Sequence, residues 1–117
     1  MEVQKLVGSV TWQDADDAES TEIERALLRD DAQTLVLDFL YDGLRYNLVM
    51  TRSGANRFSG SCQLANAKEK WTVKASGRLY SYGTEYALVG TWNESGAYQW
   101  LVELEEVDQF PDEPTKA

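Results

Sequence analysis

The stretch WTVKASGRLYSYGTEYALVGTWNESGAYQWLVEL, residues 71–104, has an apolar or small residue at every second position through three successive runs. The positions in between are mostly polar. A period of two is typical of β-strands, because successive side chains of a strand point to opposite faces of the sheet. The apolar set consists of Trp71, Val73, Ala75, Gly77 and Leu79, then Tyr86, Leu88, Gly90 and Trp92, then Tyr98, Trp100, Val102 and Leu104. The stretch therefore predicts three antiparallel strands that share one apolar face.

Further alternating runs precede this stretch, at residues 4–12, 35–41, 44–50 and 58–64. Asp42-Gly43 separates two of them, and Asp-Gly is typical of a two-residue hairpin turn, in which both turn positions need a positive φ. In the last hairpin, a three-residue loop over 94–96 keeps Trp92 and Tyr98 on one face, whereas a four-residue loop does not. The predicted fold is mainly β: an antiparallel up-and-down meander of seven or eight strands, strongly curved or closed into a small barrel.

Four glycines fall in the middle of the predicted strands on the apolar parity: Gly8, Gly60, Gly77 and Gly90. Glycine inside a strand usually marks a bend or a close approach of another backbone. Repeated bends are what a sheet needs in order to coil into a barrel. The alternative is that each glycine makes room for a facing tryptophan. Both interpretations favour a highly curved sheet.

Residues 18–29, AESTEIERALLR, predict one short amphipathic helix between the first two strands. A serine or threonine ahead of Glu24 can form a capping box with it, and most of the residues that follow are good helix formers. The alternative is a further strand over 21–29, with Ile23 and Leu27 facing inward. Propensity is a weak guide, so both interpretations are retained.

The length of 117 residues is common for one domain. We assign residues 1–107 to the β domain and residues 108–117 to an acidic, proline-containing, flexible tail. The formal net charge of −9 favours solubility and argues against general attraction to nucleic acid or to anionic membranes. The first residues contain no long apolar run and Cys62 is the only cysteine, so we expect a cytoplasmic protein without internal disulfides.

Catalysis and metal binding are not expected. The chain has no histidine, which excludes Ser-His and Cys-His nucleophile pairs and the most common zinc ligands. The inward positions of the predicted strands contain no Asp, Glu, Lys or Arg, so proton transfer in the interior is poorly supported. Cys62 is interpreted as a small core residue. We therefore predict a non-enzymatic protein without a metal ion or cofactor.

Charge is unevenly distributed along the chain. Residues 44–80 contain seven basic residues and one acid, whereas residues 13–31 contain eight acids and two arginines. Such asymmetry steers and orients binding partners. The leading hypothesis is a non-enzymatic acidic interaction module that binds or inhibits a protein partner and can form a homodimer. Its predicted contact residues are Arg45, Arg57, Lys74, Arg78, Tyr80 and Tyr82, beside the outward apolar residues Val36, Leu40, Val49, Val89 and Leu101.

The alternative hypothesis is a barrel that binds a small apolar or planar molecule, because aromatic and small residues alternate on the inward parity. The predicted ligand-binding residues are Trp12, Tyr46, Trp71, Tyr86, Trp92, Tyr98 and Trp100. The layout resembles the calyx of lipocalin or avidin barrels in general form only. The lipocalin Gly-x-Trp signature belongs near the N-terminus, whereas Gly90-Thr91-Trp92 lies near the other end, so we assign no family. These rings can also simply fill the core. A nucleic-acid-binding face on residues 44–80 is a third possibility, which the net charge opposes.

Overall fold

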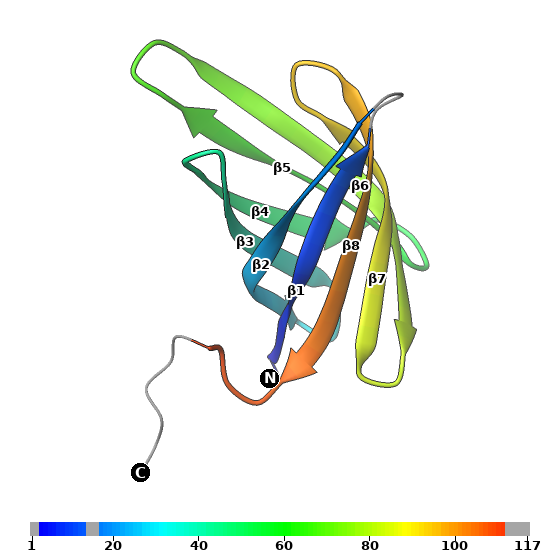
Figure 1. Ribbon diagram of the computed structural model, residues 1–117. Helices are drawn as coiled ribbons and strands as arrows, with labels where there is room; N and C mark the ends of the chain where they lie inside the picture. Colours follow the sequence, from blue (N-terminus) through cyan, green and yellow to red (C-terminus); the bar gives the residue numbers. More distant parts are fainter. Residues whose placement is uncertain (1–2, 14–16, 112–117) are drawn as a thin grey trace.

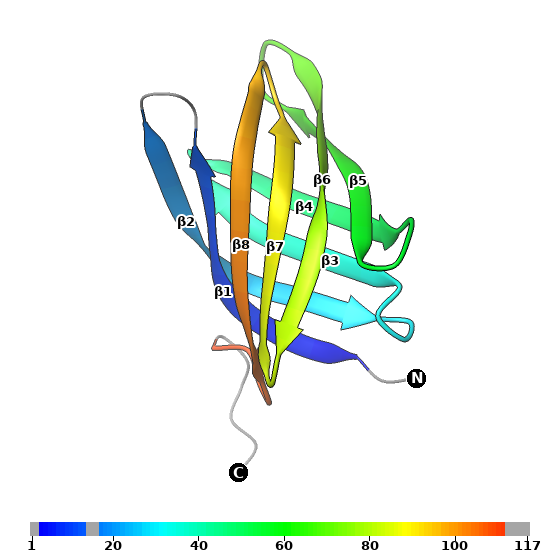
Figure 2. The same cartoon turned by 90° about the vertical axis from the view of Figure 1, so that its right-hand side faces the viewer.

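The computed structural model describes residues 3–13 and 17–111. In this part of the chain, eight antiparallel strands follow one another around a barrel, and the last pairs back to the first (Figure 1, Figure 2). The strands are β1 (Gln4–Gln13), β2 (Ala18–Arg29), β3 (Thr34–Tyr41), β4 (Leu44–Arg52), β5 (Arg57–Ala65), β6 (Lys70–Tyr82), β7 (Glu85–Asn93) and β8 (Ala97–Val107). Closure leaves no free edge strand. The predicted curved meander is therefore confirmed, as a closed barrel of eight strands.

The core of the barrel is apolar because the inward side chains of all eight strands converge on it. Trp92, Phe39 and Phe58 are among the largest fully buried side chains. Within the described ranges, no polar or charged residue is buried. Burial of this apolar surface, at roughly 25 cal/mol per Å², is the main stabilising contribution to such a fold. The middle of the barrel is therefore a packed core.

The predicted helix over residues 18–29 is wrong, because these residues form strand β2. Two residues, Glu24 and Arg25, lie opposite the single residue Val7 of β1, since Leu6 pairs with Ala26 and Gly8 pairs with Ile23. Such a β-bulge shifts the inward parity by one residue. The described residues contain no helix long enough and apolar enough to cross a membrane.

The bulge explains why the sequence suggested a helix. Ile23 and Ala26 both face inward across the bulge, so their spacing of three matches a helical period rather than a strand period. The strand alternative also placed one residue incorrectly. Leu28 is buried, whereas Leu27 is only partly buried and pairs with Lys5 on the outer parity.

The predicted hairpin turns are confirmed. Tyr41 pairs with Leu44 across the two-residue turn, and Asp42 and Gly43 have φ angles of 52° and 75°. At the other predicted site, Asn93 pairs with Ala97, which leaves the three-residue loop over 94–96. This register places Trp92 opposite Tyr98 on the inner parity.

The four mid-strand glycines mark close approaches between neighbouring strands. A Cβ atom on Gly8, Gly60 or Gly90 would lie within 2.1 Å of a carbonyl oxygen of the adjacent strand, and one on Gly77 would lie 2.9 Å from such an oxygen. No tryptophan is among the nearest atoms at any of the four. The close-approach interpretation is confirmed, and these contacts accompany the tight coiling of the barrel.

Pairing between strands is incomplete toward one end of the barrel, which we call the mouth. The turns β3–β4, β5–β6 and β7–β8 lie at this end, together with the last residue of β1 and the first residue of β2. β4 pairs with β5 only over residues 49–52 and 58–61, and β2 pairs with β3 only over 25–29 and 34–38. Figure 1 shows the β5–β6 hairpin diverging from the β3–β4 hairpin. The mouth is consequently wider than the paired part of the barrel.

The chain continues past β8 and places Phe110 beside β1 and β2. Phe110 is buried, and the Lys5 ammonium and the Arg25 guanidinium lie 5.5 and 4.9 Å from the centre of its ring. Such cation–π contacts contribute about 0.5–1 kcal/mol each at exposed sites. The remainder of the predicted flexible tail, residues 112–117, lies outside the described residues.

Candidate ligand-binding site at the mouth of the barrel

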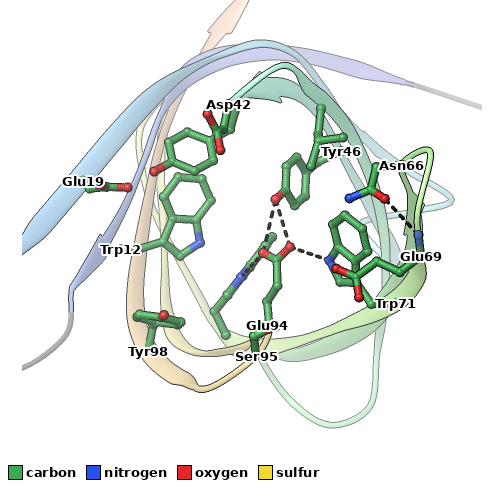
Figure 3. Close-up of a pocket in the computed structure, with 13 residues that line it drawn as sticks. Trp12, Glu19, Asp42, Tyr46, Asn66, Glu69, Trp71, Glu94, Ser95 and Tyr98 are labelled. Carbon is green, nitrogen blue, oxygen red and sulfur yellow. Dashed lines mark hydrogen bonds between the residues drawn. The ribbon is translucent and has the colours of Figure 1, made fainter.

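A pocket of about 480 Å³ opens at the mouth (Figure 3). Its wall is largely aromatic, because the inner parity of several strands carries a tryptophan or tyrosine near the mouth. The aromatic lining residues are Trp12, Tyr41, Tyr46, Trp71, Trp92 and Tyr98. The other lining residues are Glu19, Asp42, Leu44, Asn66, Glu69, Glu94 and Ser95, which lie mostly in or beside the turns.

The rings at the base of the pocket pack against one another. Phe39 stacks on Tyr46 with centroids 5.1 Å apart and an interplanar angle of 6°. Trp12 meets Trp92 edge to face at 5.3 Å, and Trp92 lies 5.1 Å from Trp100. Aromatic pairs in such geometries add about 0.5–1.5 kcal/mol each beyond the burial of their area. The base of the pocket is therefore held rigidly by the core.

The carboxylate of Glu94 turns inward over the mouth and is the most extensively hydrogen-bonded group in the pocket. It accepts hydrogen bonds from Trp71 Nε1 at 2.7 Å and from Trp92 Nε1 at 3.2 Å. The hydroxyl of Tyr46 donates to both of its oxygens, at 3.0 and 3.2 Å. Figure 3 shows these donors converging on Glu94. β4, β6 and β7 thus supply the donors, and the β7–β8 turn supplies the acceptor.

Two weakly acidic groups near this carboxylate stay protonated at neutral pH. Burial, and then the charge of Glu94, raise the pKa of the Tyr46 hydroxyl above its ordinary value, so the phenol remains a donor. The same two causes, in the same order, raise the pKa of the Cys62 thiol to about 11. A thiol with a raised pKa is a poor nucleophile, because the thiolate is the reactive form.

One donor in the pocket has no acceptor. The Nε1 atom of Trp12 is buried and makes no hydrogen bond with any described residue. In the view of Figure 3, this nitrogen lies on the side of the ring that is turned toward Glu94. Most buried polar atoms in folded proteins are hydrogen-bonded, so an unpaired donor calls for a specific explanation.

The structure brings five of the seven predicted ligand-binding residues together in this pocket: Trp12, Tyr46, Trp71, Trp92 and Tyr98. Trp100 packs behind Trp92 and donates its indole hydrogen to the carbonyl oxygen of Ser76 at 2.9 Å. Tyr86 lies toward the opposite end, where its hydroxyl donates to the side chain of Gln4.

The sequence-based prediction missed the acidic part of the site. It considered only strand positions, whereas Glu94 belongs to a turn and Glu19 is brought to the inner parity beside Trp12 by the pairing of β1 with β2. The carboxylates at the mouth therefore come from turns and from β2, and not from the inward positions of the seven predicted strands. The useful signal was present in the three-residue loop over 94–96, since a short loop keeps its first side chain close to the strand ends.

The predicted partner-binding residues lie elsewhere on the barrel. Arg57 and Arg78 are exposed and directly opposite each other on β5 and β6. Arg45 lies 3.5 Å from Asp38 in an ion pair on the outer wall. The other three residues are also exposed: Lys74, Tyr80 and Tyr82. Tyr80 exposes 51% of its surface and Tyr82 exposes 85%. None of these residues lines the mouth pocket.

Comparison with protein-family models, with curated proteins and with solved structures finds no match for this chain. Within the described ranges, no group of three His, Cys, Asp or Glu side chains is arranged to hold a metal ion.

Proposed function

We propose that this protein is a non-enzymatic, cytoplasmic barrel that binds a small organic molecule in the mouth pocket. The observation that carries the proposal is the pocket of about 480 Å³, with aromatic rings along its wall. Ligand sites are typically apolar concavities of about 300–1,000 Å³ with a few polar groups that orient the ligand. Here Glu94 and the indole nitrogen of Trp12 are such polar groups.

The partly exposed rings of the wall support a binding role beyond core packing. Trp71 and Tyr98 are only partly buried, although both lie on the inner parity. Partly exposed aromatic rings at the entrance of a concavity can bury further apolar surface when a ligand enters. The residues that fill the core, such as Phe39 and Leu48, have no surface left to bury.

The proposal is tested with the neutral dye Nile red, whose fluorescence rises in an apolar site. We expect saturable binding, weakened about tenfold by Trp71→Ala or Tyr98→Ala, since each variant removes one ring from the wall. Tyr82→Ala is the matched control, because Tyr82 is 85% exposed and does not line the pocket. If the dye does not bind, or binds equally well to both pocket variants, the proposed site is wrong.

A protein partner remains a second candidate function, which the outer face of β6 and β7 favours. Tyr80, Tyr82 and Val89 expose 51%, 85% and 49% of their surface there, beside the exposed Arg78. Aromatic side chains and arginine are enriched at the energetic centres of protein interfaces. We expect Lys74→Glu with Arg78→Glu to abolish capture of a partner or to dissociate a homodimer. This function is contradicted if the protein is strictly monomeric and every partner recovered with the wild type still binds the double variant.

A further inference from the structure

The mouth pocket combines aromatic rings with negative charge. Four of its lining residues carry a carboxylate: Glu19, Asp42, Glu69 and Glu94. No lysine or arginine is among the described lining residues. The face of an aromatic ring attracts a cation, and carboxylates around a concavity of low dielectric strengthen that attraction. A positively charged ligand is therefore favoured over an anionic one.

The contacts of Glu94 indicate what kind of cation fits. A carboxylate offers about four acceptor positions. Three hydrogens already engage both oxygens of Glu94: one from each indole of Trp71 and Trp92, and the single hydroxyl hydrogen of Tyr46, which is shared between the two oxygens. The carboxylate thus provides a fixed charge with little remaining acceptor capacity. This suits an ammonium group with alkyl substituents, which needs charge and ring faces but few hydrogen-bond acceptors.

Trp12 supplies an independent observation that points to a ligand. Only 8% of its surface is exposed, and its Nε1 atom is buried without a partner among the described residues. Leaving a buried donor unpaired is unfavourable, so an acceptor atom that arrives with the ligand relieves that cost. The pocket thus offers a ligand two different groups. The Nε1 atom of Trp12 is a donor for a hydrogen-bond acceptor of the ligand, and the carboxylate of Glu94 is a negative charge for a cation.

We propose that the ligand is an organic cation that carries a substituted ammonium group together with a hydrogen-bond acceptor. The ammonium group lies against the rings near Glu94, and the acceptor receives the hydrogen bond of Trp12 Nε1. This inference rests on the proposed function, because it identifies the chemical class of the ligand for the same pocket.

The test compares three probes by calorimetric titration of the full chain. Benzoylcholine has both features. Its neutral isostere carries a quaternary carbon in place of the nitrogen, and its benzyl ether analogue lacks the carbonyl oxygen. We expect benzoylcholine to bind about tenfold more tightly than the neutral isostere and more tightly than the ether. Trp71→Ala is expected to weaken binding of benzoylcholine and of its neutral isostere.

Charge variants separate the role of the carboxylates from the shape of the pocket. Glu94→Gln keeps an acceptor oxygen for the three donors and removes the charge, so the preference for the cation is expected to fall to about threefold or less. Glu19→Gln with Glu69→Gln changes only exposed side chains, which keeps the test valid if Glu94→Gln folds poorly. Glu103→Gln, on the outer wall, controls for net charge.

The outcomes distinguish the two proposals. Binding of the neutral isostere as tightly as benzoylcholine, with the effect of Trp71→Ala retained, overturns the organic-cation inference and leaves the proposed function in place. Binding of Nile red without binding of benzoylcholine has the same meaning. Failure of the probes and of Nile red overturns both.

Discussion

Gly90 occupies a position at which any other residue would collide with backbone. A Cβ atom there would lie 2.0 Å from the carbonyl oxygen of Ser76 and 2.4 Å from the Cα atom of Gly77. Neither atom can move without shifting β6. Single glycines of this kind allow adjacent strands to approach more closely than any residue with a side chain would permit.

We expect Gly90→Ala to destabilise the protein by about 3 kcal/mol or more, because the added methyl group forces a backbone shift in a packed sheet. Gly54→Ala is the matched control, since its Cβ would have no neighbour closer than 3.9 Å and its φ is not in the left-handed region. Urea unfolding of the two variants measures the difference. Equal midpoints would show that the close approach has no energetic consequence.

The raised pKa values of Cys62 and Tyr46 predict a loss of stability at high pH. The pKa of Cys62 rises from 9.0 to about 11, and that of Tyr46 rises above its ordinary 10.0. The unfolded chain therefore releases these protons first, and stability falls as pH increases above about 9. The contribution is fully present below that pH.

The measurement is the urea midpoint at pH 8 and at pH 10.5 for the wild type and for the variants Cys62→Ala and Tyr46→Phe. We expect each variant to lose less stability than the wild type between the two pH values, because each lacks one of the titrating groups. Equal pH dependence in all three proteins would contradict the assigned cause.

At the scale of elements, β2 shows tertiary pairing overriding local preference. Its sequence contains good helix formers, yet it pairs with β1 over most of its length and with β3 over residues 25–29. As a helix, this segment would leave neither neighbouring strand paired along that edge. Helix propensity differs by only a few tenths of a kcal/mol per residue, so the unpaired backbone decides the outcome.

A pair of substitutions at Glu22 distinguishes strand from helix in solution. Glu22 is exposed and pairs with Ser9. Threonine is favoured over alanine in a strand, within a scale of about 1 kcal/mol, whereas alanine is favoured over threonine in a helix. We expect Glu22→Thr to be more stable than Glu22→Ala in chemical denaturation. The reverse order would support a helix.

At the scale of the whole molecule, the barrel has one core that every strand shares. β1 and β8 close it, and three tryptophans from β1, β7 and β8 are in contact at the base of the pocket: Trp12, Trp92 and Trp100. No strand can leave the barrel without exposing part of this core. The incomplete pairing at the mouth is local and does not divide the core.

The shared core predicts a single cooperative unfolding transition. Tryptophan fluorescence reports mainly on the mouth and the base of the pocket, whereas far-ultraviolet circular dichroism reports on all strands. We expect both to give the same urea midpoint and the same slope, because a closed barrel of this size unfolds as one unit. Transitions that differ between the two probes would indicate that the mouth unfolds separately.

Much of the fold follows from local patterns in the sequence. The alternation in residues 71–104, the Asp42-Gly43 turn and the length of the 94–96 loop predicted strands, faces and register correctly. These features are local: the period of two, and the φ angles that a short turn requires, depend only on residues close in sequence. Most aromatic residues of the mouth were identified for the same reason.

What the tertiary structure alone decided depends on contacts between residues that are distant in sequence. The pairing of β1 with β8 selected a closed barrel over an open curved sheet, and the pairing of residues 18–29 with β1 and β3 made this segment a strand despite the bulge opposite Val7. The convergence of donors from β4, β6 and β7 on Glu94 likewise exists only after closure. No periodicity in a single segment carries this information, because hydrogen bonds across the mouth join elements whose spacing is set by the barrel as a whole.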